Sequence, residues 1–207
     1  MKLHLSITFL LLATLTVGCK NMNAELEPWL ATEDVELQNV ATDDIRRHLD
    51  ALKSEGKSFY GFVAVAGDYC TSSGPSSLSV AFNDESDIAP ENTNDPFFRY
   101  CPEEWENELR DGFDATNKTL EASYNKFKSL HKRDANSFMI DRHETAFVAR
   151  RDRAIINALK TLRGSGHFND NTFLAIWFWG SQCPVTEESV QILNTPEIYK
   201  TFVSAFR

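Results

Sequence analysis

The densest group of chemically capable side chains is a run of carboxylates between residues 103 and 114. Six of these twelve residues are acidic and one, Arg110, is basic; the acids are Glu103, Glu104, Glu106, Glu108, Asp111 and Asp114. Two carboxylates in one pocket can act as general acid and base, or hydrolyse a glycosidic bond, when the pocket separates their pKa values. On an open surface, the same run is either a solvated face or a site that attracts a basic partner.

The partner-binding interpretation of this run centres on four residues. We expect Glu104, Glu108 and Asp111 to capture a basic protein, and the acidic residues between positions 84 and 95 extend the same negative surface. Trp105 lies within the run, so we expect it either to contact the partner or to fix the segment to the core. Attraction of this kind speeds association and is screened by salt.

The histidines and serines carry no catalytic or metal-binding signature. No two of the five histidines have the i, i+4 spacing that places two ligands on one helix face, and Arg142-His143-Glu144 lacks the second histidine of a zinc-protease motif. Gly180-Ser181 is not embedded in a Gly-x-Ser-x-Gly sequence, and there is no Cys-x-x-Cys pair. We therefore expect no metal and no cofactor, and we assign no catalytic residue.

Two of the four cysteines stand at matching places in the sequence. Gly67 and Cys70 have the same spacing as Gly180 and Cys183, and each pair follows an apolar segment. If these segments are neighbouring parallel strands, both cysteines extend equally far beyond the sheet, and an oxidising compartment permits a Cys70–Cys183 disulfide. Cys101 is then left over, and the alternative is three separate reduced thiols.

The N-terminus is typical of an exported bacterial lipoprotein. Met1-Lys2 precedes a short apolar segment that ends at Gly18-Cys19, which predicts a signal peptide over residues 1–18 and acylation of Cys19. The alternative is an ordinary secretory signal. Lys20 after the acylated position favours the periplasmic face of the outer membrane. Residues 19–41 are acidic and lack periodicity, so we expect a tether there.

The remaining chain, residues 42–207, reads as one α+β domain. Apolar spacing predicts helices over residues 43–53, 120–130 and 148–162, and Thr195-Pro196-Glu197 begins a further helix. Residues 59–65 and 78–82 are expected to be antiparallel strands. Residues 172–179 are apolar on both faces and predict a central strand. Few strands with grouped helices indicate one small mixed or antiparallel sheet with helices packed against it.

Composition excludes one class of partner. The chain has 207 residues, 42% of them hydrophobic, and a formal net charge of −9. Binding of nucleic acid without sequence preference requires clustered Lys and Arg to neutralise phosphates. We therefore expect no nucleic-acid partner.

Four segments resemble a bacterial family, domain of unknown function 4303. They are Phe59-Tyr60-Gly61-Phe62, the stretch from Phe98 to Trp105, the helix around Ala158-Leu159-Lys160, and Ser189-Val190-x-x-Leu193-Asn194. Cys101 stands where that family usually has Ser, and the lipoprotein leader is a further departure. The resemblance covers about residues 42–206 and implies no activity and no catalytic residue.

These features predict a membrane-anchored protein of the cell envelope that acts by binding. Short acidic α+β proteins of this style often resemble immunity proteins, so the more specific hypothesis is neutralisation of a basic toxin. Two alternatives stay open at this point. One is a hydrolase acting on envelope material, and the other is a structural or ligand-binding envelope lipoprotein.

Overall fold

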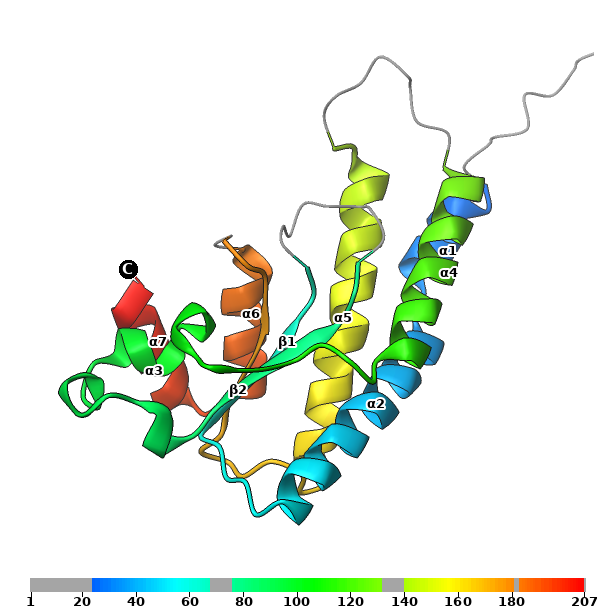
Figure 1. Ribbon diagram of the computed structural model, residues 1–207. Coiled ribbons are helices and arrows are strands. Elements are labelled where there is room, and N and C mark those ends of the chain that lie inside the picture. Colours follow the sequence, from blue (N-terminus) through cyan, green and yellow to red (C-terminus); the bar gives the residue numbers. More distant parts are fainter. Residues whose placement is uncertain (1–23, 68–75, 132–139, 181–182, 207) are drawn as a thin grey trace, which may run out of the picture.

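Four strands form one mixed sheet in the order β3-β2-β1-β4 (Figure 1). The computed structural model describes residues 24–67, 76–131, 140–180 and 183–206. Its strands are β1 (Gly61–Val65), β2 (Ser79–Asn83), β3 (Asn107–Leu109) and β4 (Phe173–Trp177). β1 pairs antiparallel with β2 and parallel with β4. The α+β prediction is confirmed, and the sheet is of the mixed kind.

Seven α-helices and three short 3-10 helices complete the described chain. The α-helices are α1 (Leu26–Ala31), α2 (Val35–Ser54), α3 (Pro96–Tyr100), α4 (Asp114–Leu130), α5 (Arg142–Gly164), α6 (Pro184–Leu193) and α7 (Pro196–Phe206). The 3-10 helices are η1 (Glu85–Asp87), η2 (Pro90–Asn92) and η3 (Pro102–Glu104). Within this part of the chain, no helix is long and apolar enough to cross a membrane.

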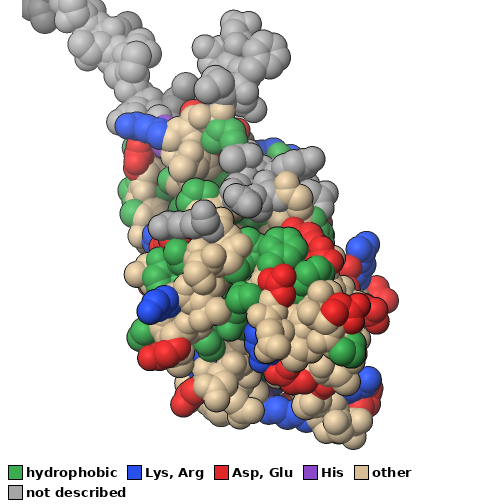
Figure 2. Space-filling model, turned by 90° about the vertical axis from the view of Figure 1, so that its left-hand side faces the viewer, with side chains coloured by type: hydrophobic (Ala, Val, Ile, Leu, Met, Phe, Trp, Pro, Cys, Tyr) green, Lys and Arg blue, Asp and Glu red, His purple; other side chains and the backbone are tan. Residues whose placement is uncertain are grey.

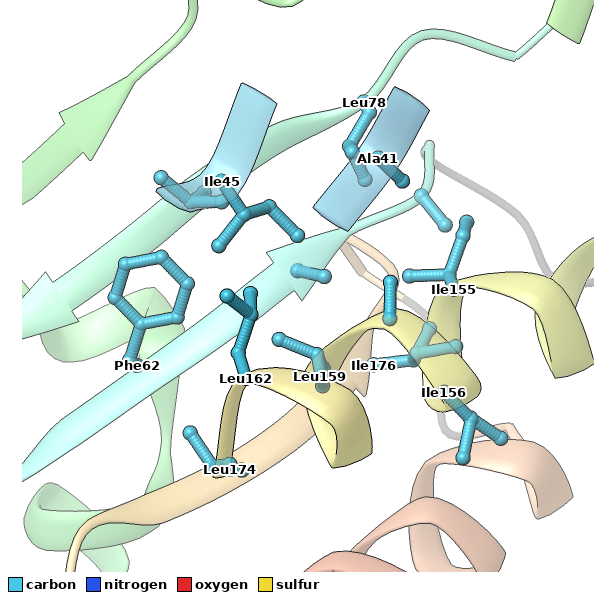
Figure 3. Packing of buried hydrophobic residues seen from close by; sticks show 14 of the residues in the cluster. Ala41, Ile45, Phe62, Leu78, Ile155, Ile156, Leu159, Leu162, Leu174 and Ile176 are labelled. Atoms are coloured by element: carbon cyan, nitrogen blue, oxygen red, sulfur yellow. The ribbon is translucent and has the colours of Figure 1, made fainter. Parts of the chain in front are cut away.

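The sheet has a helical layer on each side because its strands β1 and β4 are apolar at every position. Successive strand residues point to opposite faces, and all five residues of β1 and of β4 are buried. Phe62 and Leu174 pack with α2 and α5, as Figure 3 shows, whereas Val63 and Phe173 pack against the side of α3 and α7. A strand covered on both faces loses the alternating pattern of a half-buried strand.

β4 is an edge strand, so the prediction of a central strand was wrong. Only β1 pairs with it, and its other edge lies against α6. Asn194 takes the place of a neighbouring strand, because its Oδ1 accepts from Leu174 N at 2.8 Å and its Nδ2 donates to Leu174 O at 2.7 Å. Ser189 Oγ accepts from Ile176 N at 3.0 Å. Side chains of α6 thus satisfy backbone groups that an open edge leaves unpaired.

The tether predicted for residues 19–41 does not extend to residue 41. Leu26 and Leu37 are fully buried, and α1 packs on α5. Asp34 caps α2 by accepting from Leu37 N, and it forms a buried ion pair with Arg150 of α5. The glutamates of this segment face solvent while its leucines face the helices, so the segment shows no single continuous pattern in the sequence. Cys19 lies outside the described residues.

The acidic run forms a short turn followed by a short strand. Pro102–Glu104 makes a single 3-10 turn, and Asn107–Leu109 pairs antiparallel with β2. Three residues of intermediate burial give too short a pattern to identify a strand from the sequence.

Candidate functional site

A cavity of about 560 Å³ opens beside the carboxyl end of β4. Trp177, the last residue of β4, and Gly180 beyond it form its base. The remaining walls come from α3, η3, the first turn of α6 and the last turns of α7. Segments from the middle and from the C-terminal part of the sequence therefore build one site, at the end of the molecule that Figure 1 shows on its left.

One wall of the cavity is aromatic. Phe202 and Phe206 lie one helical turn apart on α7, with ring centroids 4.8 Å apart. Phe206 also lies 5.6 Å from Phe97 and 6.3 Å from Trp177, between ring centroids. Phe97 is 40% exposed, which is unusual for a side chain of its size and marks the open edge of this wall.

Carboxylates line the same cavity. Glu103 and Glu104 of η3 are exposed, and Glu187 of α6 is half-buried. Tyr199 Oη donates to Glu187 Oε1 at 3.0 Å, which fixes that carboxylate at the cavity. In Figure 2, which views this end of the molecule, hydrophobic side chains lie beside acidic ones. Aromatic side chains and carboxylates in one cavity suit a ligand that is both cationic and partly apolar.

Two polar atoms at the cavity have no partner among the described residues. Trp177 is 7% exposed and Thr186 is 6% exposed, and both line the cavity. Trp177 Nε1 and Thr186 Oγ1 are buried without a hydrogen bond. Leaving a buried donor unsatisfied costs about 1–3 kcal/mol. A bound group with an acceptor would remove this cost.

Cys101 at the cavity is not a nucleophile. Burial raises the pKa of its thiol to about 12, and the Glu103 carboxylate adds to this effect. Sγ donates to Glu103 Oε2 at 3.3 Å. The thiol therefore stays protonated at neutral pH, whereas a nucleophilic cysteine requires a lowered pKa.

No Ser-His-carboxylate arrangement is assembled at the cavity by the residues that the structure describes there. None of the residues that line it is a serine or a histidine. Ser181, which follows Gly180, lies outside the described residues. The carboxylates sit on an open rim, so the geometry favours binding over the acid–base chemistry that a closed pocket supports.

Cys183 is disulfide-bonded and Cys101 is free. The premise of the Cys70–Cys183 prediction is confirmed, because β1 and β4 are parallel neighbours with Val65 opposite Trp177. Cys70 itself lies outside the described residues, so the pairing stays a prediction.

The structure separates the predicted partner-binding residues. Glu104 lies at the cavity. Glu108 lies on β3, where it accepts from Ser79 Oγ at 3.1 Å and pairs with Arg110. Asp111 is exposed in the turn before α4. These three carboxylates are close together in the sequence, but of the three only Glu104 lines the cavity.

Trp105 takes the second of its two predicted roles. It is 9% exposed and packs edge-to-face on Tyr60, with centroids 6.0 Å apart. A Cβ added at Gly61 would lie 2.5 Å from Trp105 Cη2, so only glycine leaves room for the indole. Trp105 thereby fixes the acidic segment to the sheet.

Two groups of residues were missed from the sequence. The start of α7 was predicted, but its aromatic side chains were not identified as part of a site. His131, Asp141 and His143 lie together although their spacing matches no metal motif. Neither set has a local signature, because each forms only when separate helices meet.

The chain belongs to the family described as domain of unknown function 4303, whose model matches residues 41–195. The match covers the sheet, α3 to α6 and most of α2, and it includes Gly61, Trp105, Ser189 and Asn194. Comparison with curated proteins and with solved structures gives no match.

Proposed function

We propose that this protein acts by binding and that the cavity captures a basic segment of a partner protein. The observation that carries the proposal is the combination, in one cavity, of an aromatic wall, three carboxylates and two unpartnered buried polar atoms. Each part has a matching group on a basic peptide segment.

The charged and apolar parts of the cavity suit an arginine or lysine side chain. Its aliphatic stem would pack on Phe202 and Phe206 while its cation approaches Glu103 and Glu104. A guanidinium also stacks favourably on aromatic rings. Trp177 Nε1 donates a hydrogen bond, and a backbone carbonyl of the bound segment would accept it.

The cellular setting belongs to the same proposal. Acylation of Cys19 would hold the domain at the periplasmic face of the outer membrane, where it would meet proteins delivered from outside. A basic toxin is then the proposed partner, and capture of its cationic surface is the immunity-type mechanism. Cys19→Ser is expected to release the protein from membranes or to block its processing, as fractionation and intact mass would show.

A second candidate function follows from the cavity volume. Cavities of about 300–1,000 Å³ are typical of small-molecule sites, and this one is about 560 Å³. An envelope lipoprotein that binds a small cationic amphiphile would use the same wall and rim. A hydrolase acting on envelope material has no such support from the described residues.

Tryptophan fluorescence titration with a capped Arg-Leu-Arg-Leu peptide tests the proposal. Glu103→Gln combined with Glu104→Gln is expected to weaken binding about tenfold, because charge-assisted contacts are lost. Glu108→Gln combined with Asp111→Asn removes the same charge away from the cavity and should leave affinity nearly unchanged. Equal weakening by both pairs would contradict a specific role for the cavity.

A further inference from the structure

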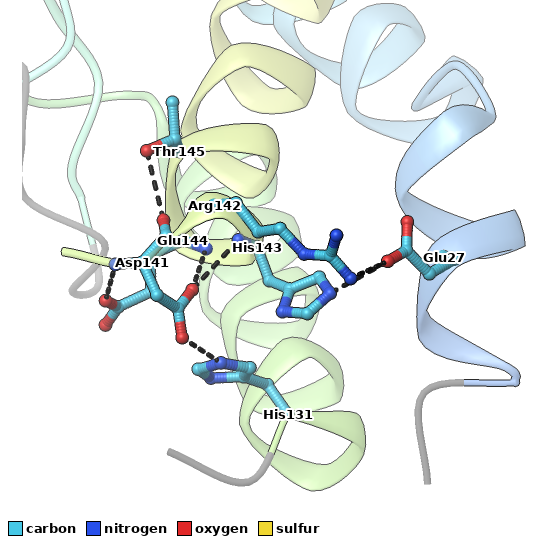
Figure 4. A network of polar contacts seen from close by, with 7 residues as sticks. All are labelled: Glu27, His131, Asp141, Arg142, His143, Glu144 and Thr145. Atoms are coloured by element: carbon cyan, nitrogen blue, oxygen red, sulfur yellow. Dashed lines mark hydrogen bonds and ion pairs between the residues drawn. The ribbon is translucent and has the colours of Figure 1, made fainter. Parts of the chain in front are cut away.

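Three helices bring two imidazoles and two carboxylates together at the far end of the molecule from the cavity (Figures 1 and 4). Glu27 comes from α1, His131 caps the C-terminus of α4, and Asp141 and His143 lie at the start of α5. His131 and His143 have ring centroids 5.6 Å apart. These residues lie outside the proposed partner site and are not used by it.

Each imidazole already faces a carboxylate. His131 Nε2 lies 2.7 Å from Asp141 Oδ2, and His143 Nε2 lies 3.0 Å from Glu27 Oε1. One ligand atom from each of His131, Asp141 and His143 lies within 4.8 Å of the others. Tetrahedral coordination with bonds of about 2.1 Å needs ligand atoms roughly 3.4 Å apart. Binding of a metal ion therefore requires these side chains to move closer together.

The surroundings hold these side chains in position. The His131 side chain is 7% exposed and that of His143 is 11% exposed. The His131 ring stacks on Phe127, with centroids 4.8 Å apart. Asp141 Oδ1 accepts from the backbone N–H groups of His143 and Glu144, both at 2.9 Å, which orients Oδ2 toward His131. A partly dry, pre-oriented ligand set is what a metal site requires.

The charge balance also suits a cation. Among the residues that the structure describes, Glu27, Asp141 and Glu144 lie in this network with one permanent cation, Arg142. Its side chain is 77% exposed, and its Nη2 lies 2.8 Å from Glu27 Oε1. Arg142 can move into solvent without leaving a buried charge. Neutral imidazole nitrogens with carboxylate oxygens form a donor set preferred by zinc and neighbouring transition metals.

We propose that His131, Asp141 and His143 bind a divalent transition-metal ion of the Zn²⁺ class, with Glu27 as the fourth ligand. The ion would join α1, α4 and α5 at one point, so it would stabilise the docking of α1 on the helical layer. His131, Asp141 and His143 lie inside the region matched by the family model, whereas Glu27 lies outside it. The inference is independent of the proposed partner binding.

Calorimetric titration of the chelator-treated full-length protein with ZnCl₂ tests this site. We expect one equivalent to bind and the melting temperature to rise with metal concentration, because a ligand of the native state stabilises it. Loss of a group that only hydrogen-bonds a metal ligand costs about 10–100-fold in metal affinity. His143 is proposed as a ligand itself, so His143→Ala should weaken binding at least about 100-fold. Titration with Co²⁺ should give the visible absorption of a tetrahedral site.

Two variants separate a lost ligand from a damaged fold. His143→Gln keeps a polar side chain facing Glu27, and it should fold with an unchanged spectrum while losing the tight site. His167→Ala removes a histidine that lies 4.0 Å from Asp50, outside the cluster, and should bind like the parent. Absence of stoichiometric binding to the parent, or binding that survives His131→Ala combined with His143→Ala, would overturn the proposal.

Discussion

The two ends of the molecule use their polar groups in opposite ways. Where α1, α4 and α5 meet, polar side chains have partners: the buried Arg150 pairs with Asp34, and the half-buried Asp141 caps α5. At the cavity, Trp177 Nε1 and Thr186 Oγ1 are buried and have no partner among the residues that the structure describes, and Phe97 is exposed. Buried polar groups are almost always satisfied. The proposed binding of an external ligand at the cavity would account for this contrast.

The predicted disulfide should contribute most to stability. In the chain-entropy model, a bridge from Cys70 to Cys183 closes a long loop and thereby raises the free energy of unfolding by about 4–5 kcal/mol. Cys183→Ser should lower the free energy of unfolding by that order, measured by urea denaturation, and peptide mapping without reduction should find Cys70 attached to Cys183. Cys183 attached to another cysteine would refute the pairing.

Loss of the buried ion pair between Arg150 and Asp34 should cause the next largest decrease in the free energy of unfolding. Arg150→Ala leaves Asp34 charged, 10% exposed and without its cation, and breaking such a pair typically costs about 3–5 kcal/mol. Arg46→Ala is the control, because the Arg46–Asp43 pair is exposed and should contribute at most about 1 kcal/mol. Similar losses for the two variants would show that α1 and the start of α2 do not dock as described.

Close packing between Gly61 and Trp105 predicts a smaller loss of stability, which depends on the side chain at position 105. Gly61→Ala places a methyl group against the indole, and overpacking of this kind costs about 1–3 kcal/mol. Trp105→Phe should recover part of that loss in the double variant, because the two sites are coupled. If Gly61→Ala is neutral, Trp105 does not anchor the acidic segment to β1.

The raised pKa of Cys101 predicts that the protein loses stability at high pH. Its pKa rises from 9.0 to about 12 on folding, so the unfolded chain releases the proton first. Stability from this group is complete below about pH 9 and is lost as the pH rises toward 12. Iodoacetamide should therefore label Cys101 slowly in the native protein at pH 9 and rapidly in urea. Equal labelling rates would contradict a buried, protonated thiol.

Strands and long helices could be predicted from the sequence, because their apolar patterns run over many residues. β1, β2, α4 and α5 follow the predicted segments. β3 was missed because it has three residues of intermediate burial, and β4 was placed centrally because α6 covers its edge through Asn194. A side chain that replaces a neighbouring strand leaves no periodic signal.

The candidate site was predicted only in part. Glu104 was identified, but with Glu108 and Asp111, which β3 and the following turn carry away from the cavity. Trp177 was recognised as a buried strand residue, and nothing local indicates that its indole nitrogen lacks a partner. Cavities depend on which helices approach the end of a strand, and that is a property of tertiary packing.

The most direct test of the account compares two indoles that are both buried and unpartnered. Trp177 lines the cavity, whereas Trp105 packs beneath the acidic segment. In ¹H–¹⁵N spectra, a capped Arg-Leu-Arg-Leu peptide should shift the Trp177 indole N–H signal and leave that of Trp105 in place. A shift confined to Trp105, or no shift of Trp177 at saturating peptide, would contradict capture of a basic segment in the cavity.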